Sequence, residues 1–123
     1  MKALRLAALA LAFSACAPAV PEISVQQLKD KLDKKEKIIL LDVREPKEYA
    51  LAKIEGSRLI PLGALPERLG ELDKSAQVLV HCKRGGRSAK AVQFLREKGY
   101  DAVNVAGGID AWSESIDPSV PKY

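Results

Sequence analysis

Short apolar runs recur along the chain and alternate with stretches whose apolar residues follow helical spacing. The runs at 38–41 and 78–80 contain no polar residue, which is typical of strands buried on both faces of a sheet. A further short strand is expected at 103–105 and a brief one at 59–60. Because helical segments separate these runs, the pattern predicts an α/β fold, a parallel sheet with helices on both faces.

The expected helices begin and end at recognisable residues. Ser24 and Gln27 fit a capping box at the start of the first helix. A longer helix carries Ser88 on its buried face and ends at Gly99. Shorter helical stretches are expected at 46–52, at 61–69 and after Gly107, the last one carrying Trp112 as a core aromatic residue.

The first fifteen residues have the charge order of an export signal. Two cations, Lys2 and Arg5, precede the apolar residues 6–13, and small residues follow. The apolar run is shorter than the ~20 residues that span a bilayer. We therefore interpret residues 1–15 as a signal peptide of the lipoprotein type, rather than as a helix of the domain.

Two cleavage sites compete at the end of this signal. The residues around Cys16 resemble a bacterial lipobox, in which Cys16 becomes the lipidated first residue and anchors the protein to a membrane. Cleavage after Ala17, at an A-x-A site, would instead release a soluble protein. Both routes predict an exported protein, either periplasmic or a membrane-anchored lipoprotein. The expected divisions of the chain are a signal peptide at 1–15, a tether at 16–22, the domain at 23–114 and a C-terminal tail at 115–123.

Composition narrows the classes of function. The 123 residues suit one domain, and 47% apolar with 29% charged residues is a globular composition. Lys and Arg number 20 against 16 Asp and Glu, a net charge of +4, and part of this surplus lies in the expected signal. So small a surplus, with only 5% aromatic residues, argues against nucleic acid as a partner. Two cysteines and one histidine exclude a multi-disulfide framework and a multi-histidine metal site, so no metal or other cofactor is expected.

Cys82 is the strongest candidate for chemistry, because it lies at the end of the apolar run at 78–80. Ligands bind at the carboxyl ends of the strands in an open parallel sheet. Gly85 and Gly86 permit a tight loop whose N–H groups turn inward, and a helix is expected to open at 87–88. Three cations lie within five residues of the sulfur: Lys83, Arg84 and Arg87. Each of these features favours thiolate over thiol, so Cys82 is expected to be a nucleophile beside a seat for an anion.

Cys82 could instead have a purely structural role or ligate a metal ion. A free cysteine at a strand end is often only a small buried hydrophobic residue, but the glycines and cations argue against that role for Cys82. A metal site lacks ligands, because only His81 is near. His81 precedes Cys82 by one residue, so its side chain is expected on the opposite face of the sheet, in a structural role.

Three segments together resemble a single rhodanese domain, a sulfurtransferase module with an α/β fold. They are residues 40–45 with Tyr49, residues 54–57 leading to 60–61, and residues 82–88 followed by the motif at 107–112. The resemblance covers roughly residues 22–114. Residues 81–91 are similar to the rhodanese domain at the C-terminus of molybdopterin-synthase and thiamine-type adenylyltransferases. An export signal is expected here where those proteins carry the adenylyltransferase, which argues against a cytosolic role in cofactor biosynthesis.

The resemblance implies a two-step mechanism. The Cys82 thiolate attacks the outer sulfur of a small anionic donor such as thiosulfate, and a persulfide forms within the N–H groups of residues 83–87, Gly85 and Gly86 included. A thiophilic acceptor, namely cyanide, a thiol or a protein cysteine, then takes the sulfur. By the same resemblance Arg87 closes the cradle and pairs with oxygen of the donor, while Lys83 and Arg84 attract the donor from the rim.

Asp42 and Arg44 are expected to support the site. Asp42 follows an apolar strand, so we expect it at the same strand-end face as Cys82. In the family this Asp-x-Arg pair braces the neighbourhood of the loop, and direct contact with the substrate is the alternative. Ser88 is placed with the supporting residues.

The alternatives to a sulfurtransferase are a cysteine-dependent phosphatase and a binding module or persulfide carrier. Cysteine-dependent tyrosine phosphatases place an arginine six positions after the cysteine, whereas Arg87 lies five positions after Cys82. The loop is also one residue shorter than in the Cdc25-type phosphatases, which leaves less room for a phosphoryl group. A non-catalytic binding module or a persulfide carrier is the remaining alternative, and the intact Cys82 argues against the first of these.

Overall fold

The computed structural model describes residues 19–123. The expected signal peptide, Cys16 and the rest of residues 16–18 lie outside this range. The strands are β1 (Glu22–Ile23), β2 (Ile38–Asp42), β3 (Arg58–Leu59), β4 (Gln77–His81) and β5 (Ala102–Val105). The helices are α1 (Val25–Asp33), α2 (Pro46–Leu51), α3 (Gly86–Glu97) and α4 (Gly108–Ser115), with a 3-10 helix η1 (Leu62–Glu71).

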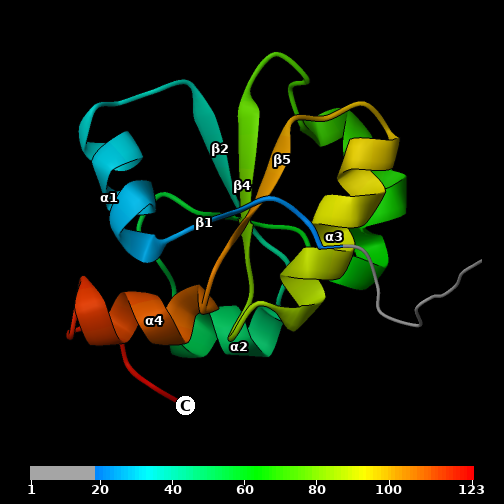
Figure 1. The fold of residues 1–123 in the computed structure, drawn as a ribbon. Coiled ribbons are helices and arrows are strands. Elements are labelled where there is room, and N and C mark those ends of the chain that lie inside the picture. Colours follow the sequence, from blue (N-terminus) through cyan, green and yellow to red (C-terminus); the bar gives the residue numbers. More distant parts are fainter. Residues whose placement is uncertain (1–18) are drawn as a thin grey trace, which may run out of the picture.

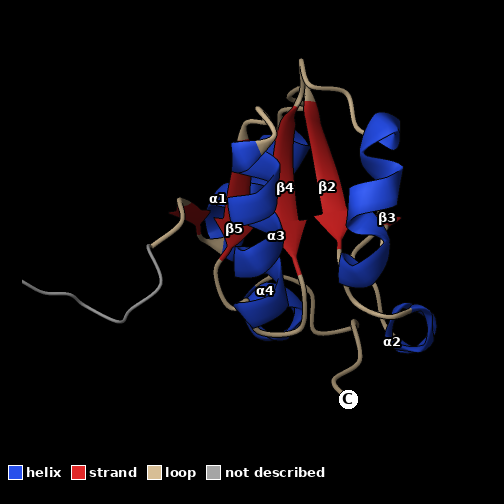
Figure 2. Ribbon diagram, turned by 90° about the vertical axis from the view of Figure 1, so that its right-hand side faces the viewer, coloured by secondary structure: helices blue, strands red, loops and turns tan. Residues whose placement is uncertain are grey.

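One parallel sheet runs through the centre of the molecule, in the order β1-β5-β4-β2-β3 (Figure 1). The central strand β4 pairs with β2 from Ile38 opposite Gln77 to Asp42 opposite His81. This register brings the carboxyl ends of the two strands level with each other. Helices lie on both sides of the sheet (Figure 2), as the alternation of apolar runs and helical segments predicted.

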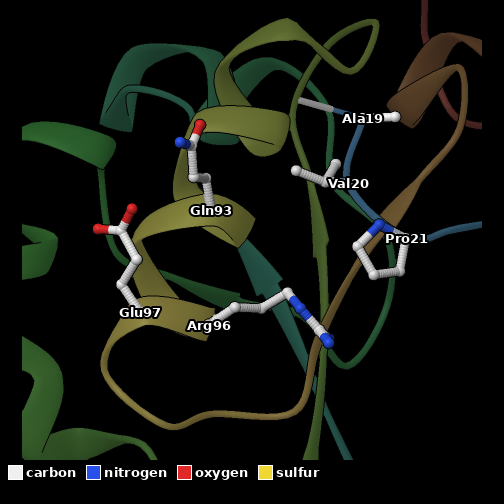
Figure 3. A pocket seen from close by; sticks show the side chains of 6 residues that line it. All are labelled: Ala19, Val20, Pro21, Gln93, Arg96 and Glu97. Atoms are coloured by element: carbon white, nitrogen blue, oxygen red, sulfur yellow. The ribbon is translucent and has the colours of Figure 1, made fainter. Parts of the chain in front are cut away.

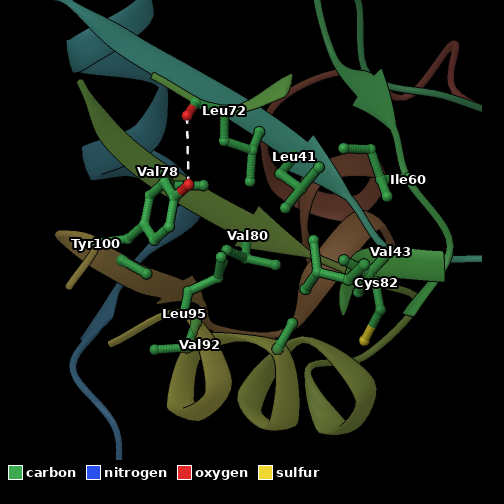
Figure 4. Close-up of a cluster of buried hydrophobic side chains, with 13 residues drawn as sticks. Leu41, Val43, Ile60, Leu72, Val78, Val80, Cys82, Val92, Leu95 and Tyr100 are labelled. Atoms are coloured by element: carbon green, nitrogen blue, oxygen red, sulfur yellow. Dashed lines mark hydrogen bonds between the residues drawn. The ribbon is translucent and has the colours of Figure 1, made fainter. Parts of the chain in front are cut away.

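Each face of the sheet has its own apolar core. On one face α1 and α4 pack against Leu40 and Leu79. On the other face α3 and η1 pack against Leu41 and Val80, and Cys82 lies at one end of that cluster (Figure 4). Successive side chains of a strand point to opposite faces of the sheet, so His81 and Cys82 lie on different faces. His81 is fully buried on its face, as expected.

Two expected segments take a more specific or a different form in the structure. The helical stretch expected at 61–69 is present as η1, a run of 3-10 turns over Leu62–Glu71 that contains Pro66, which has no N–H to donate. The expected tether does not extend to residue 22, because Glu22 lies in β1 and pairs with β5. Pro21 accepts a hydrogen bond from the Asn104 N–H (2.8 Å), so residues 19–22 belong to the fold.

The expected tail is also part of the fold. Val120 is buried beside α4, and its carbonyl accepts a hydrogen bond from Ser113 (2.7 Å). Tyr123 reaches the carboxyl end of the sheet, where it contacts Arg44 and Lys83. The chain after α4 therefore returns to the edge where Cys82 lies.

A hollow of about 360 Å³ lies between residues 19–21 and α3 (Figure 3). Its described lining residues carry no thiol, hydroxyl or imidazole group: Ala19, Val20, Pro21, Gln93, Arg96 and Glu97. Within residues 19–123, no helix is both long and apolar enough to cross a membrane.

Candidate active site

Cys82 lies immediately after β4, at the first residue of a short loop that leads into α3. The loop turns at Gly85, whose φ of 114° is accessible to glycine and strained for other residues. The helix begins at Gly86, one residue before the expected start. The strand end, the glycine turn and the helix start therefore surround the sulfur, in the arrangement that the sequence pattern predicted.

The Cys82 sulfur receives several hydrogen bonds from this loop. The Gly85 N–H donates to Sγ at 3.1 Å and the Ser88 N–H at 3.4 Å, and the Ser88 hydroxyl lies 3.3 Å from Sγ. Burial by itself raises the pKa of the Cys82 thiol, but the bonds from Ser88, Gly85 and Arg84 outweigh it, and the net pKa is lowered. These donors belong to the loop and to the first turn of α3.

The sulfur faces a hollow of about 460 Å³. Five residues line it, and all of them belong to the loop and the start of α3: Cys82, Lys83, Arg84, Gly86 and Arg87. The hollow is open to solvent on one side and large enough for a small anion. The expected substrate-binding residues thus gather around it, with Gly85 forming the turn beneath.

Arg87 is held by a carboxylate that the sequence analysis did not single out. Its two terminal nitrogens donate to Glu48 of α2 at 2.6 and 3.0 Å. Hydrogen bonds from Arg87, against the opposing effect of burial, lower the pKa of Glu48 to about 2. The same pairing, together with the nearby Cys82 charge, raises the pKa of Arg87. Arg87 is therefore a fixed cation at the mouth of the hollow.

Lys83 is engaged by the protein itself, whereas we expected it at the rim to attract a donor. Its ammonium group bonds both oxygens of Asp110 (3.1 and 3.2 Å) and the main-chain oxygen of Tyr123 (2.6 Å), so its three N–H donors are in use. Arg84 also donates to Asp110 at 3.1 Å, but its side chain is 79% exposed. Arg84 thus keeps the rim position that was expected.

Asp42 ends β2 at the same carboxyl edge of the sheet as Cys82, but its side chain lies on the opposite face of the sheet. It pairs in register with His81 of β4, and residues opposite one another in neighbouring parallel strands point to the same side of the sheet. The carboxylate of Asp42 instead binds Arg44, at 2.6 Å from Nη2 and 3.0 Å from Nε. Both side chains are fully buried. Direct contact of Asp42 with a substrate at Cys82 is therefore disfavoured, and bracing of the neighbourhood is favoured.

Arg44 supports α2 from within the protein. Its guanidinium donates to the carbonyls of Glu48 and Ala52 and to the Tyr123 hydroxyl. Because Glu48 holds Arg87, the buried Asp42–Arg44 pair acts on the rim of the hollow through α2. His81 lies 3.9 Å from Asp42, and burial lowers the pKa of its imidazole, which favours the neutral form in a structural role.

The loop is braced from its other side by β5 and α4. Asn104 donates to the Gly85 carbonyl at 3.2 Å, and the N–H groups of Ile109 and Asp110 donate to the carbonyls of Cys82 and Lys83. Gly108 permits this approach: a Cβ there would lie 2.5–2.7 Å from main-chain atoms of Cys82 and Lys83. The backbone that shapes the anion seat is thus fixed at both ends.

Three residues at the site were missed by the sequence analysis: Glu48, Asp110 and Tyr123. Glu48 lies between residues 40–45 and Tyr49, which carried part of the resemblance, and Asp110 is the unspecified position of the motif at 107–112, so both lay next to residues that were noted. Tyr123 carried no signal. Within residues 19–123, no group of histidine, cysteine and acidic side chains is arranged to hold a metal ion.

The chain matches the model of the Rhodanese-like domain family over residues 24–115. It is 37% identical to the adenylyltransferase and sulfurtransferase MOCS3 of Arabidopsis thaliana, over 86% of this chain and 26% of that protein. The chain therefore spans about a quarter of the length of such relatives. It is also 37% identical to the Bacillus subtilis protein named "Putative sulfurtransferase YtwF", over 80% of this chain and 96% of that one.

Solved structures show the same fold. A Staphylococcus saprophyticus protein superposes with a TM-score of 0.72 at 35% identity, covering 83% of this chain and 99% of that one. A rhodanese-like domain protein from Staphylococcus aureus superposes with a TM-score of 0.72 at 38% identity, covering 75% and 90%.

Proposed function

The chain belongs to the rhodanese-like family, and we propose that it is a sulfurtransferase that carries sulfane sulfur as a persulfide on Cys82. One observation supports this most directly. The Cys82 sulfur is surrounded by N–H groups and the Ser88 hydroxyl, which stabilise negative charge on a sulfur atom. A persulfide anion on Cys82 would carry its charge into the hollow beside the same loop.

In the first step, the Cys82 thiolate attacks the outer sulfur of a donor such as thiosulfate. A new S–S bond forms to Cys82, the S–S bond of thiosulfate breaks, and sulfite leaves with the electron pair of that bond. In the second step, an acceptor thiolate or cyanide attacks the outer sulfur of the persulfide. The bond to Cys82 breaks, and the Cys82 thiolate is restored. No proton is consumed when the acceptor enters as an anion.

The cations around the hollow contribute to donor binding in different ways. Arg87 uses two of its five N–H donors on Glu48 and keeps three for donor oxygens. Arg84 is exposed and contributes attraction at the rim. Gly85 and Gly86 provide main-chain N–H groups without side chains that would close the hollow. Lys83 contributes charge at longer range, because its own donors are satisfied by Asp110 and Tyr123.

Whole-protein mass spectrometry after incubation with thiosulfate tests this proposal. The wild-type protein is expected to gain one sulfur atom, which cyanide removes as thiocyanate. Cys82→Ser removes the nucleophile and is expected to abolish both the mass gain and the thiocyanate. A serine variant that still turns over thiosulfate would contradict the proposal.

A persulfide carrier is the second candidate, because one relative is named "Putative sulfur carrier protein YrkF" and is 38% identical over 79% of this chain. A carrier would gain sulfur in the same experiment but would pass it to a protein thiol far faster than to cyanide. Comparing the two acceptors on the preloaded protein therefore separates a carrier from a general sulfurtransferase.

We also propose that the protein is exported and held at a membrane through acylated Cys16. The support is the order of charge and apolar residues at positions 1–15 and the position of Cys16 directly after them. Labelling cells with a palmitate analogue is expected to mark the protein in the membrane fraction, and Cys16→Ser is expected to remove the label. Unlabelled protein beginning at Pro18 would favour release by ordinary cleavage, and protein retaining Met1 in the cytosol would overturn export.

A further inference from the structure

Tyr123 lies outside residues 24–115, which match the family, yet it contacts three charged residues of the site, Arg44, Glu48 and Lys83. Resting on the proposed function, we propose that Tyr123 is a positioning residue that holds Arg87 in place for an anionic sulfur donor and occupies the ammonium group of Lys83. The argument depends on the Tyr123 hydroxyl and on its ring and main-chain oxygen.

The hydroxyl of Tyr123 joins two ion pairs. It donates to Glu48 Oε2 at 2.8 Å and accepts from Arg44 Nη1 at 2.9 Å. Arg44 is bound to the buried Asp42, and Glu48 is bound to Arg87. A continuous chain of hydrogen bonds therefore runs from the end of β2 to the mouth of the hollow, and Tyr123 is the member that connects its two halves.

This connection restricts the orientation of Glu48. Its carboxylate accepts two bonds from Arg87, one from Tyr123 and one from the N–H of Glu45 at 3.0 Å. Four donors saturate the usual acceptor positions of a carboxylate. A carboxylate fixed in this way presents Arg87 in one orientation. Without the Tyr123 hydroxyl, Glu48 can turn, and Arg87 turns with it.

The rest of Tyr123 acts on Lys83. The Lys83 ammonium lies 4.3 Å from the centre of the Tyr123 ring and 2.6 Å from its main-chain oxygen. These contacts are a cation–π interaction and a hydrogen bond to a charged donor, and both favour the position that Lys83 occupies. Tyr123 thereby helps to occupy the N–H donors of Lys83, so Arg87 is the cation with free donors beside Cys82.

Thiosulfate binding measured by calorimetry tests the role of the hydroxyl. A Cys82→Ser background is used, so that no sulfur is transferred during the titration. Tyr123→Phe removes the hydroxyl and keeps the ring over Lys83. We expect a roughly three- to tenfold rise in the Kd of thiosulfate, the range for losing one hydrogen bond that orients a charged partner. In the active protein, the KM for thiosulfate is expected to rise by a similar factor, while kcat stays the same.

Two controls separate positioning from a general effect on the fold. Tyr100→Phe and Tyr49→Phe each remove a hydroxyl that bonds a carbonyl away from Arg87, so both are expected to leave the Kd unchanged. In an Arg87→Ala background, Tyr123→Phe is expected to cause no additional loss, because the effect passes through Arg87.

Three results would overturn the inference: no thiosulfate binding to the Cys82→Ser protein, an unchanged Kd in Tyr123→Phe, or the same loss with and without Arg87. The calorimetry does not require sulfur transfer. A wild-type protein that binds thiosulfate but never gains sulfur would therefore refute the proposed function and leave the role of Tyr123 standing.

Discussion

Burial and hydrogen bonding act on the Cys82 thiol in opposite directions. The sulfur is almost inaccessible to solvent, which disfavours its charged form. Ser88, in the first turn of α3, opposes this effect of burial through two contacts with the sulfur, one from its hydroxyl and one from its N–H. A fully buried serine beside the cysteine thus favours the thiolate form.

Ser88→Ala is expected to raise the pKa of Cys82, since one hydrogen bond to a charged group is lost while the N–H remains. The thiolate is the form that is alkylated, so the alkylation rate rises as pH passes upward through the pKa. The midpoint of that rise should lie below the ordinary thiol pKa in the wild type and move to higher pH in the variant. Iodoacetamide kinetics against pH provide the measurement. Ser113→Ala, another buried serine, should leave the midpoint in place.

Arg87 and Lys83 carry the same charge but have different partners. Arg87→Ala is expected to lower kcat/KM for thiosulfate more than Lys83→Ala, because Arg87 has free N–H donors at the hollow and Lys83 has none. Loss of a charged hydrogen bond corresponds to about 1.5–3 kcal/mol. Steady-state kinetics with thiosulfate and cyanide measure both variants, and small, equal losses would show that Arg87 does not contact the donor.

Among the elements, α4 has a direct role in shaping the loop after β4. Its first turn donates two N–H groups to the carbonyls of Cys82 and Lys83. Gly108 makes this approach possible through a φ of 58° and the absence of a side chain. The start of α4 and the loop therefore form one packed unit, although about 25 residues of sequence separate them.

Gly108→Ala is expected to lower the free energy of unfolding by about 2–4 kcal/mol. A left-handed conformation costs about 1–2 kcal/mol for a residue with a Cβ, and overlap with the loop backbone adds a similar amount. Urea denaturation measures the change. Gly63→Ala is the matched control, because a Cβ at Gly63 meets nothing within 4 Å. Equal stability of the two variants would mean that the loop moves aside without cost.

The elements that the sequence predicted correctly are those with local signals. The capping box of Ser24 and Gln27 forms as expected, and the apolar runs at 38–41 and 78–80 lie within β2 and β4. β1 was missed because two residues have no pattern of their own, and they become a strand only by pairing with β5. The sheet face to which the Asp42 side chain points was not predicted, because side-chain direction follows from register, which no single strand reveals.

The same distinction applies to the site. Cys82 and its loop are contiguous in sequence, so spacing was enough to predict them. Glu48 is 39 positions from Arg87 and Tyr123 is 40 positions from Lys83. Many carboxylates of the chain could have paired with Arg87, and only the tertiary fold, which brings Glu48 of α2 to the start of α3, decides which one does.

For the whole molecule, the folded unit extends beyond the residues that match the family. Residues 19–23 add a strand to the edge of the sheet, and their carbonyls accept hydrogen bonds from Asn104 and Ala106 at 2.8 Å. Residues 116–123 bury Val120 and bring Tyr123 to the site. The first extension contributes to stability, and the second contributes to both stability and the arrangement of charges.

Four lengths of chain separate these contributions: 19–123, 24–123, 19–115 and 24–115. Removing residues 19–23 is expected to cost about 2–4 kcal/mol of unfolding free energy, from two hydrogen bonds and the burial of Val20 and Ile23. Removing residues 116–123 is expected to cost a similar amount and also to weaken thiosulfate binding, because Tyr123 is lost. The fragment 24–123 should bind thiosulfate as the longest one does, measured below its unfolding transition. Equal urea midpoints for all four fragments would show that neither extension stabilises the domain. Unchanged thiosulfate binding by 19–115 would show that the charges around Cys82 are arranged without Tyr123.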